Sequence, residues 1–232
     1  MAERRVDVVI VGSGAGGGTV AQALAPLCVQ GHSVAVLEWG DRIAPSECDG
    51  DEVRMAERLF VDSGGVLTRD RTLTLATGRA FGGSTVVYTG TSLRMPREVC
   101  ESWAVPGLEF DDLDRRARRH CADTNVHLLP DEEINENNRL FKTGCEALGY
   151  RVAQFPLNVK GCRGAGLCNL GCPNGAKQGT HVVQLPAAEA AGVEMGKIAL
   201  YTRNASSVDA TDQAAAGRNV QAISLMSRFL AA

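Results

Sequence analysis

The sequence predicts an α/β fold of the Rossmann type, because a strand, a glycine-rich turn, a helix and a second strand follow one another near the N-terminus. β-Branched residues occupy every position of 6–11 except Asp7 without a helical period, which is typical of a strand buried on both faces. Ala, Leu and Val recur at helical spacing over 19–29, and residues 32–38 form a second apolar run that ends in Glu38. Together these segments predict a βαβ unit.

The remaining elements are expected to continue this α/β pattern as one domain over residues 1–232. Residues 41–70 are polar and irregular apart from a short helix at 53–60. Residues 97–150 predict a helical insertion, in which acids precede bases over 111–119 as the helix dipole favours. Further elements are a helix at 134–148 ended by Gly149, a Cys- and Gly-rich loop at 161–179, a short helix led by Pro186, and strands at 197–201 and about 220–225.

Composition excludes several classes of function. The chain has 232 residues, 44% of them hydrophobic, and its 24 Lys and Arg against 27 Asp and Glu give a net charge of −3. A nucleic-acid-binding protein would carry a basic surplus. The longest apolar run near the N-terminus, Val8–Val11, is far shorter than the ~18 residues of a membrane-spanning helix. We therefore expect no nucleic-acid partner and no transmembrane segment.

The glycine-rich turn has the spacing of a dinucleotide-binding loop. Gly12, Gly14 and Gly17 form a G-x-G-x-x-G pattern between the first strand and the helix. In such a loop the glycines allow a tight turn, close approach of a pyrophosphate and close helix packing, while N–H groups at the helix start meet the phosphate charge. Glu38 follows about 20 residues later, where a carboxylate accepts hydrogen bonds from a ribose. The expected contacts are Gly12, Gly14, Ala15, Gly16, Gly17 and Glu38.

This pattern does not distinguish FAD from NAD, and one alternative stays open. In that alternative the segment is an ordinary glycine-rich turn, and Glu38 is merely exposed at the end of a strand.

A second glycine-rich segment, Gly78-Arg79-Ala80-Phe81-Gly82-Gly83-Ser84-Thr85, precedes Arg94-Met95-Pro96. Adjacent glycines allow close backbone contact, and the two hydroxyls can bond phosphate or flavin oxygens. The segment resembles a signature of the glucose-methanol-choline (GMC) oxidoreductases, in which such a loop lies against the flavin and pyrophosphate of FAD. The resemblance implies FAD as the cofactor, held by Gly78, Arg79, Gly82, Gly83, Ser84 and Thr85. Many family members have Asn where this chain has Tyr88, so that contact is not assigned.

The resemblance covers nearly the whole chain. It continues through Trp103 and residues 169–178 to residues 185–188. Residues 203–208 resemble the stretch where family members place a Val whose backbone meets the adenine, which makes Val208 a further candidate. The implied fold is a Rossmann-like, GMC-type FAD-binding domain with a helical insertion, incomplete without a C-terminal half or a partner chain.

Three of the eight cysteines share a glycine-rich loop as Cys162-x5-Cys168-x3-Cys172. Three thiolates on such a loop can ligate a compact soft-metal centre such as a 3Fe-4S cluster. The spacing resembles that of the FAD-dependent glucose dehydrogenase branch of the GMC family, whose catalytic subunits hold such a cluster and pass electrons to a cytochrome. Two alternatives remain: a zinc site with His181 as fourth ligand, and metal-free structural thiols. The other cysteines are expected to be ordinary small apolar residues.

The resemblance implies oxidation of a CH–OH group in an alcohol or sugar by hydride transfer to flavin. Family members take the hydroxyl proton with a His near their C-terminus, and no such segment follows Leu225 here. No catalytic residue is therefore assigned. We expect a second chain to complete the substrate domain, and an electron carrier such as a cytochrome.

Two other readings of the function stay open. The first is a non-catalytic nucleotide-binding subunit that scaffolds or regulates a partner, and the second is a cluster-free alcohol oxidase fragment. With no secretory signal visible, we expect the protein in the cytoplasm, or exported together with a partner.

Overall fold

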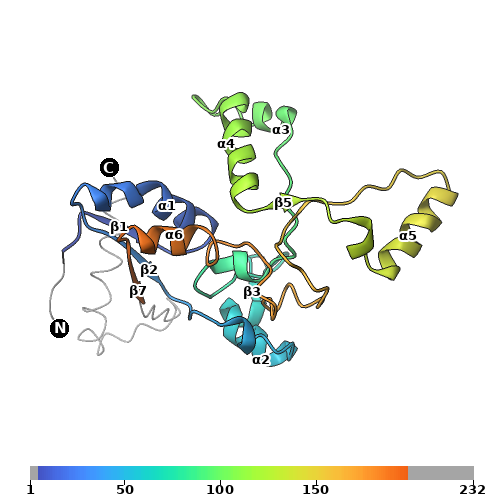
Figure 1. Ribbon diagram of the computed structural model, residues 1–232, viewed down its shortest axis with the longest axis horizontal. Coiled ribbons are helices and arrows are strands. Elements are labelled where there is room, and N and C mark those ends of the chain that lie inside the picture. Colours follow the sequence, from blue (N-terminus) through green and yellow to red (C-terminus); the bar gives the residue numbers. More distant parts are fainter. Residues whose placement is uncertain (1–4, 198–232) are drawn as a thin grey trace. The chain divides into compact units, whose positions relative to one another are not determined.

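A computed structural model describes residues 5–197 (Figure 1). The chain divides into two compact units, Met1–Lys197 and Ile198–Ala232, and only the first is described below. Val208 and the strand predicted at about 220–225 lie outside the described residues, as does all of the strand predicted at 197–201 except its first residue.

The N-terminal segments form the predicted βαβ unit. Strand β1 (Val8–Val11) leads through the glycine turn into helix α1 (Ala15–Val29), which returns to strand β2 (Val34–Glu38). The two strands pair in parallel, with Ile10 opposite Val36. A third strand, β7 (Glu194–Lys197), pairs in parallel with β2, so the sheet order is β1-β2-β7. This strand ends at the residue where the sequence predicts a strand to begin.

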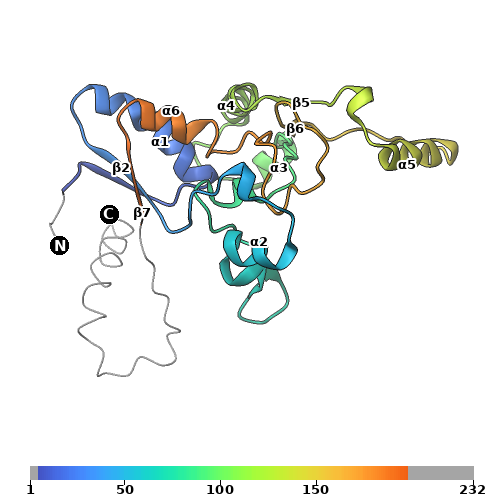
Figure 2. The same cartoon turned by 60° about the horizontal axis from the view of Figure 1, so that its bottom comes forward.

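Helix α6 (Gln184–Ala190) lies beside α1 and helps to close the first core (Figures 1 and 2). The core combines apolar residues of β1, β2, α1 and α6 with Phe81; its buried members are Ile10, Ala21, Ala25, Val34, Val36, Phe81, Leu185, Ala188 and Val193. Burying a Val, Leu, Ile or Phe side chain of this core stabilises the fold by roughly 1.5–3 kcal/mol.

Strand β1 is not buried on both faces, contrary to expectation. Ile10 is buried, but Val9 and Val11 are 41% and 46% exposed. Successive side chains of a strand point to opposite faces, so Val9 and Val11 lie on the face away from the core that contains Ile10.

A second core forms around helix α2 (Glu52–Leu59), close to the helix predicted at 53–60. Asp51 caps this helix by accepting a hydrogen bond from the Arg54 amide. Met55 and Leu59 of α2 are fully buried with Cys48, Ala80, Val86 and Val87. A hairpin of β3 (Val66–Leu67) and β4 (Thr74–Leu75) follows α2.

Between 97 and 150 the chain forms α3 (Arg97–Ser102), α4 (Phe110–Asp123) and α5 (Glu136–Ala147). Acids and bases three and four residues apart pair along α4, as in Asp114–Arg118. The sequence pattern missed β5 (Val126–His127), which separates α4 from α5 and pairs antiparallel with β6 (Leu157–Asn158). Strands of two residues have too few positions to show a period of two.

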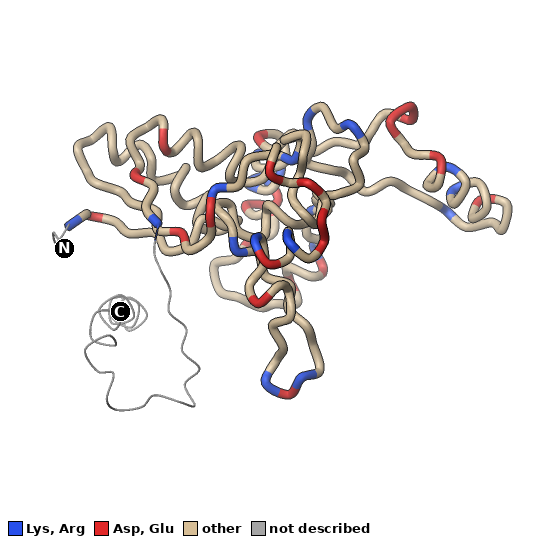
Figure 3. Tube along the Cα trace, turned by 90° about the horizontal axis from the view of Figure 1, so that it is seen from below, with Lys and Arg blue, Asp and Glu red and all other residues tan. Residues whose placement is uncertain are grey.

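Basic and acidic residues are interspersed along the described trace (Figure 3). Among the described helices, none combines the length and apolar content that crossing a bilayer requires.

Candidate cofactor site

The first glycine turn needs its glycines for steric reasons. Gly12 has φ +89°, and its N–H donates to the carbonyl of Leu37 at 2.8 Å, which joins the turn to β2. A Cβ on Gly17 would overlap the carbonyl oxygen of Gly12. Helix α1 begins after Gly14 with no side chain capping its first turn. The uncapped N–H groups and the positive end of the helix dipole fit a phosphate group.

Glu38 ends β2 directly beside this turn. It is only 8% exposed, so the alternative that places it at an open strand end does not hold. Its carboxylate accepts hydrogen bonds from the Ser13 amide at 2.8 Å, the Ser13 hydroxyl at 2.5 Å and the Gly40 amide at 2.7 Å. These bonds use three of roughly four lone-pair sites. A ribose contact at Glu38 stays a prediction, because the carboxylate has few lone pairs left to accept a hydrogen bond from a ribose hydroxyl.

The second glycine loop touches the first. Gly82 and Gly83 have φ +108° and +53°, and they lead into a short 3₁₀ helix, η3 (Gly83–Val86). A Cβ on Gly83 would lie 2.7 Å from the Cα of Gly14, which shows how closely the two backbones approach. The Gly82 amide donates to the Ser13 hydroxyl at 2.8 Å. The fold therefore brings the two predicted cofactor loops together, although they are far apart in sequence.

Two threonines extend this contact. The Thr85 hydroxyl donates to the carbonyl of Gly82 at 2.6 Å and accepts from the Thr180 amide at 3.1 Å. The Thr180 hydroxyl donates to the carbonyl of Ser13 at 2.9 Å. Ser13 and Thr180 are site residues that the sequence pattern did not predict. Ser13 was visible only as a variable position of the G-x-G-x-x-G pattern, and Thr180 only as a polar residue just after the Cys- and Gly-rich loop.

The remaining predicted cofactor contacts have other neighbours in the described structure. Ser84 accepts a hydrogen bond from the Gly78 amide at 2.9 Å, which closes the loop on itself. The Arg79 guanidinium donates to the carbonyl of Glu57 at 2.8 Å and lies 5.4 Å from the ring centroid of Trp39. The Arg79 side chain is thus engaged at the end of α2.

The three cysteines predicted as metal ligands are not gathered. Within residues 5–197 no group of three or more His, Cys, Asp or Glu side chains is placed to hold a metal ion. Cys172 instead accepts a bond from the Ala176 amide at 3.3 Å, and Cys162 accepts one from the Gly164 amide at 3.5 Å. The described arrangement fits neither a 3Fe-4S cluster nor a zinc site, because three sulfur ligands must share one centre.

Cys48 lies against Gly171, at the cysteine loop, and belongs to the second core. It is 5% exposed, and burial raises the pKa of its thiol. A protonated, buried thiol is a small apolar residue, as the sequence predicts for Cys48.

Lys177 and His181 are buried titratable residues next to the second glycine loop. Lys177 is 2% exposed; its ammonium donates to the carbonyls of Val86, at 2.8 Å, and Cys168, and burial lowers its pKa. The His181 ring packs against Gly82 and Gly179, and its Nδ1 is buried without a hydrogen-bond partner in the described residues. Burial, together with the charge of Lys177, lowers the pKa of His181 to about 4.

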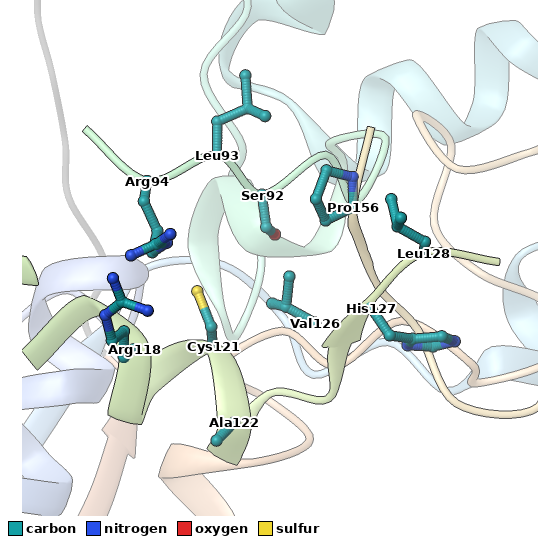
Figure 4. Close-up of a pocket in the computed structure, with 10 residues that line it drawn as sticks. All are labelled: Ser92, Leu93, Arg94, Arg118, Cys121, Ala122, Val126, His127, Leu128 and Pro156. Atoms are coloured by element: carbon teal, nitrogen blue, oxygen red, sulfur yellow. The ribbon is translucent and has the colours of Figure 1, made fainter. Parts of the chain in front are cut away.

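The described residues line two cavities. One, of about 330 Å³, is lined by residues that include Arg42, Cys48, Phe81, Cys172, Lys177 and His181. The other, of about 620 Å³, has Arg94 and Arg118 at one end and Leu128 at the other (Figure 4). Both arginines form ion pairs with Asp114 at that end.

A family model described as GMC oxidoreductase matches residues 56–223, more than half of the chain. The chain belongs to the GMC oxidoreductase family. This confirms the resemblance expected from the second glycine loop. The glucose dehydrogenase branch suggested by the cysteine spacing is not shown.

Relatives of this GMC chain include enzymes of known activity. It is 39% identical over 197 residues to an uncharacterised GMC-type oxidoreductase of Mycobacterium tuberculosis. The aligned part covers 82% of this chain and 31% of that protein. It is 34% identical over 178 residues to long-chain-alcohol oxidase FAO4A of Arabidopsis thaliana, covering 75% of this chain and 24% of the oxidase. The chain thus spans a quarter to a third of these relatives.

The fold also matches a solved structure. Pyridoxine 4-oxidase from Mesorbium loti aligns with a TM-score of 0.55 at 18% identity, over 83% of this chain and 42% of that one. At this identity the likeness shows the α/β fold alone.

Proposed function

We propose that this GMC chain forms the FAD-binding part of an oxidoreductase that acts on a CH–OH group. The observation that carries the proposal is the contact between the two glycine loops, where Gly83 approaches the Cα of Gly14. Gly14 and Gly83 carry no side chain where their backbones meet, and the uncapped start of α1 adjoins this point. A dinucleotide pyrophosphate needs such close access to backbone N–H groups.

Residues of this chain would bind and orient the cofactor. The first turn of α1 would hold the pyrophosphate, and Gly82 and Gly83 would admit the flavin side of the dinucleotide close to their backbone. When bound, FAD supplies the acceptor for a hydride from the substrate carbon. Within residues 5–197 we assign no base for the hydroxyl proton. His181 lies at the loop, but its lowered pKa of about 4 leaves it neutral and weakly basic.

The substrate class follows from the relatives as a proposal. One relative, 34% identical, carries the name long-chain-alcohol oxidase. We propose an alcohol or a sugar as the substrate. We also propose a second chain that completes the active site and an electron carrier such as a cytochrome.

The described residues give no support for a 3Fe-4S cluster. Iron analysis of anaerobically purified protein decides it. About three irons per chain with an oxidised-state electron paramagnetic resonance signal would establish the cluster. Protein free of iron would leave the metal-free oxidase alternative.

Cofactor binding tests the proposed function. Titration of the purified full chain with FAD should quench flavin fluorescence in a saturable way, and excess NAD should not compete. A chain that does not bind FAD, or that binds NAD more tightly than FAD, would overturn the proposal. Binding of FAD to a complete assembly that never oxidises any alcohol or sugar would favour a scaffolding or regulatory subunit.

A further inference from the structure

A short segment at the end of the cysteine loop, continuing to Thr180, contacts both ends of η3, the turn at Gly83–Val86. We call residues 176–180 the clamp segment. An isolated β-bridge pairs its Lys177 with Val159, and backbone hydrogen bonds from Lys160 to Ala176 and from Gln178 to Asn158 hold it on both sides of that bridge. Backbone hydrogen bonds therefore hold the clamp segment in place independently of the contacts that its side chains make with the turn.

Thr180 holds the start of the turn. It is 3% exposed, and its amide donates to the Thr85 hydroxyl at 3.1 Å. Its hydroxyl has one proton, and the carbonyl of Ser13 at 2.9 Å is nearer than that of Gly82 at 3.3 Å. Thr180 thus joins the two glycine loops, through its hydroxyl to Ser13 and through its amide to Thr85.

Lys177 holds the end of the same turn. Its buried ammonium donates to the carbonyl of Val86 at 2.8 Å, and it lies 5.4 Å from the ring centroid of Tyr88. Burying an ammonium is costly unless it is hydrogen-bonded, so these contacts offset a real penalty. The same ammonium also bonds the carbonyl of Cys168, which ties the turn to the cysteine loop.

We propose that Thr180 and Lys177 are positioning residues, which clamp η3 from both ends and hold its glycines against Gly14 for the cofactor. The inference rests on the proposed function, because FAD is the proposed ligand of this turn. Neither side chain need touch the cofactor. Each acts through backbone carbonyls of Ser13, Gly82 or Val86.

Hydrogen exchange tests the clamp without any cofactor. Thr180→Val removes the hydroxyl with little change of shape, Thr180→Ser restores it, and Lys177→Met removes the ammonium. Matched controls are Thr143→Val and Lys142→Met, which change exposed residues of α5. Loss of a hydrogen bond worth about 1 kcal/mol should speed amide exchange in residues 82–87 by roughly five- to tenfold. The Ser variant and both controls should stay near the wild-type rate.

FAD titration of the same variants tests the positioning role. We expect Thr180→Val to weaken FAD binding about tenfold and to change the visible circular dichroism of bound flavin, with Thr180→Ser restoring both. An unchanged rate of amide exchange in residues 82–87 of Thr180→Val would overturn the proposed clamp. This variant tests the clamp even if Lys177→Met does not fold. Faster exchange with unchanged FAD affinity would overturn the positioning role. Wild-type protein that binds no FAD would overturn the proposed function. The hydrogen-exchange measurement needs no FAD, so it would still test the clamp.

Discussion

At the scale of single residues, Ser13 connects the two halves of the candidate site. Its hydroxyl is fully buried, donates to Glu38 and accepts from the Gly82 amide. One small side chain therefore satisfies an acid of β2 and a backbone donor of the second loop. In the interior such a group is costly to lose, because its former partners stay buried without replacement bonds.

Ser13→Ala should therefore destabilise the protein. It leaves the Gly82 N–H without its acceptor and removes one of the three bonds to Glu38. We expect the free energy of unfolding to fall by about 1–3 kcal/mol, measured by urea denaturation. Ser102→Ala is the control, since Ser102 is exposed and bonds only a carbonyl of its own helix. Equal losses in the two variants would contradict the assigned role.

Gly17 and Gly16 form a matched pair of glycines one residue apart. Gly17→Ala drives a methyl group into the carbonyl of Gly12, whereas a Cβ on Gly16 meets nothing within 4 Å. We expect Gly17→Ala to abolish FAD binding and to lower stability by more than about 2 kcal/mol. Gly16→Ala should keep wild-type stability or gain up to about 1 kcal/mol, because alanine favours the helix. Fluorescence titration and urea denaturation measure both; indistinguishable variants would refute the close-packing argument.

At the scale of elements, the entry into α6 is unusual because it buries a titratable ring. His181 packs between Gly82 of the second loop and Gly179 of the clamp segment, three residues before α6 begins at Gln184. Substituting a side chain at either glycine would displace the ring. The charged residues that line the same cavity are Arg42 and Lys177, and the positive charge of Lys177 disfavours a protonated imidazole.

His181 should therefore make stability depend on pH. An unfolded histidine has a pKa near 6.5, and burial lowers the pKa of His181 to about 4. The folded state binds fewer protons, so this stability is complete above pH ~6.5 and is lost as the pH falls toward ~4. Between pH 7 and pH 4.5, wild type should lose about 2 kcal/mol more than His181→Gln in urea denaturation. A His181→Gln profile that matches the wild-type profile would contradict the assignment.

At the scale of the whole molecule, the site is assembled from three distant parts of the chain. Ser13 and Gly82 are 69 positions apart, and Ser13 and Thr180 are 167 apart. These contacts join the βαβ unit, the second glycine loop and the clamp segment. A ligand that binds across them stabilises the described unit as a whole, because unfolding any part removes the site.

FAD should accordingly raise the stability of the chain. At a free concentration a hundred times its dissociation constant, we expect an increase of about 2.7 kcal/mol in the free energy of unfolding. Urea denaturation with and without FAD measures the change, and NAD at equal concentration is the control. Stabilisation by NAD to the same extent would argue for a general dinucleotide site.

Much of the fold could be predicted from local pattern. The run of β-branched residues in β1, the helical spacing of α1 and the acid at Glu38 predict a βαβ unit, and the structure has one. The strand pair β5–β6 could not be predicted, since two residues per strand carry no periodic signal. The cysteine spacing predicted a metal centre, but spacing alone does not determine whether a loop turns its sulfurs toward one point.

The sequence by itself determined where this protein needs glycine. Gly12, Gly82 and Gly83 have positive φ angles, and that conformation excludes most other residues, so the requirement is local and appears directly as a motif. Only the tertiary structure decided which polar side chains join the loops. The Thr180 hydroxyl and the Lys177 ammonium each bond a distant backbone carbonyl, 167 and 91 positions away. A backbone carbonyl has no residue-type signature, so these contacts exist only once the chain has folded.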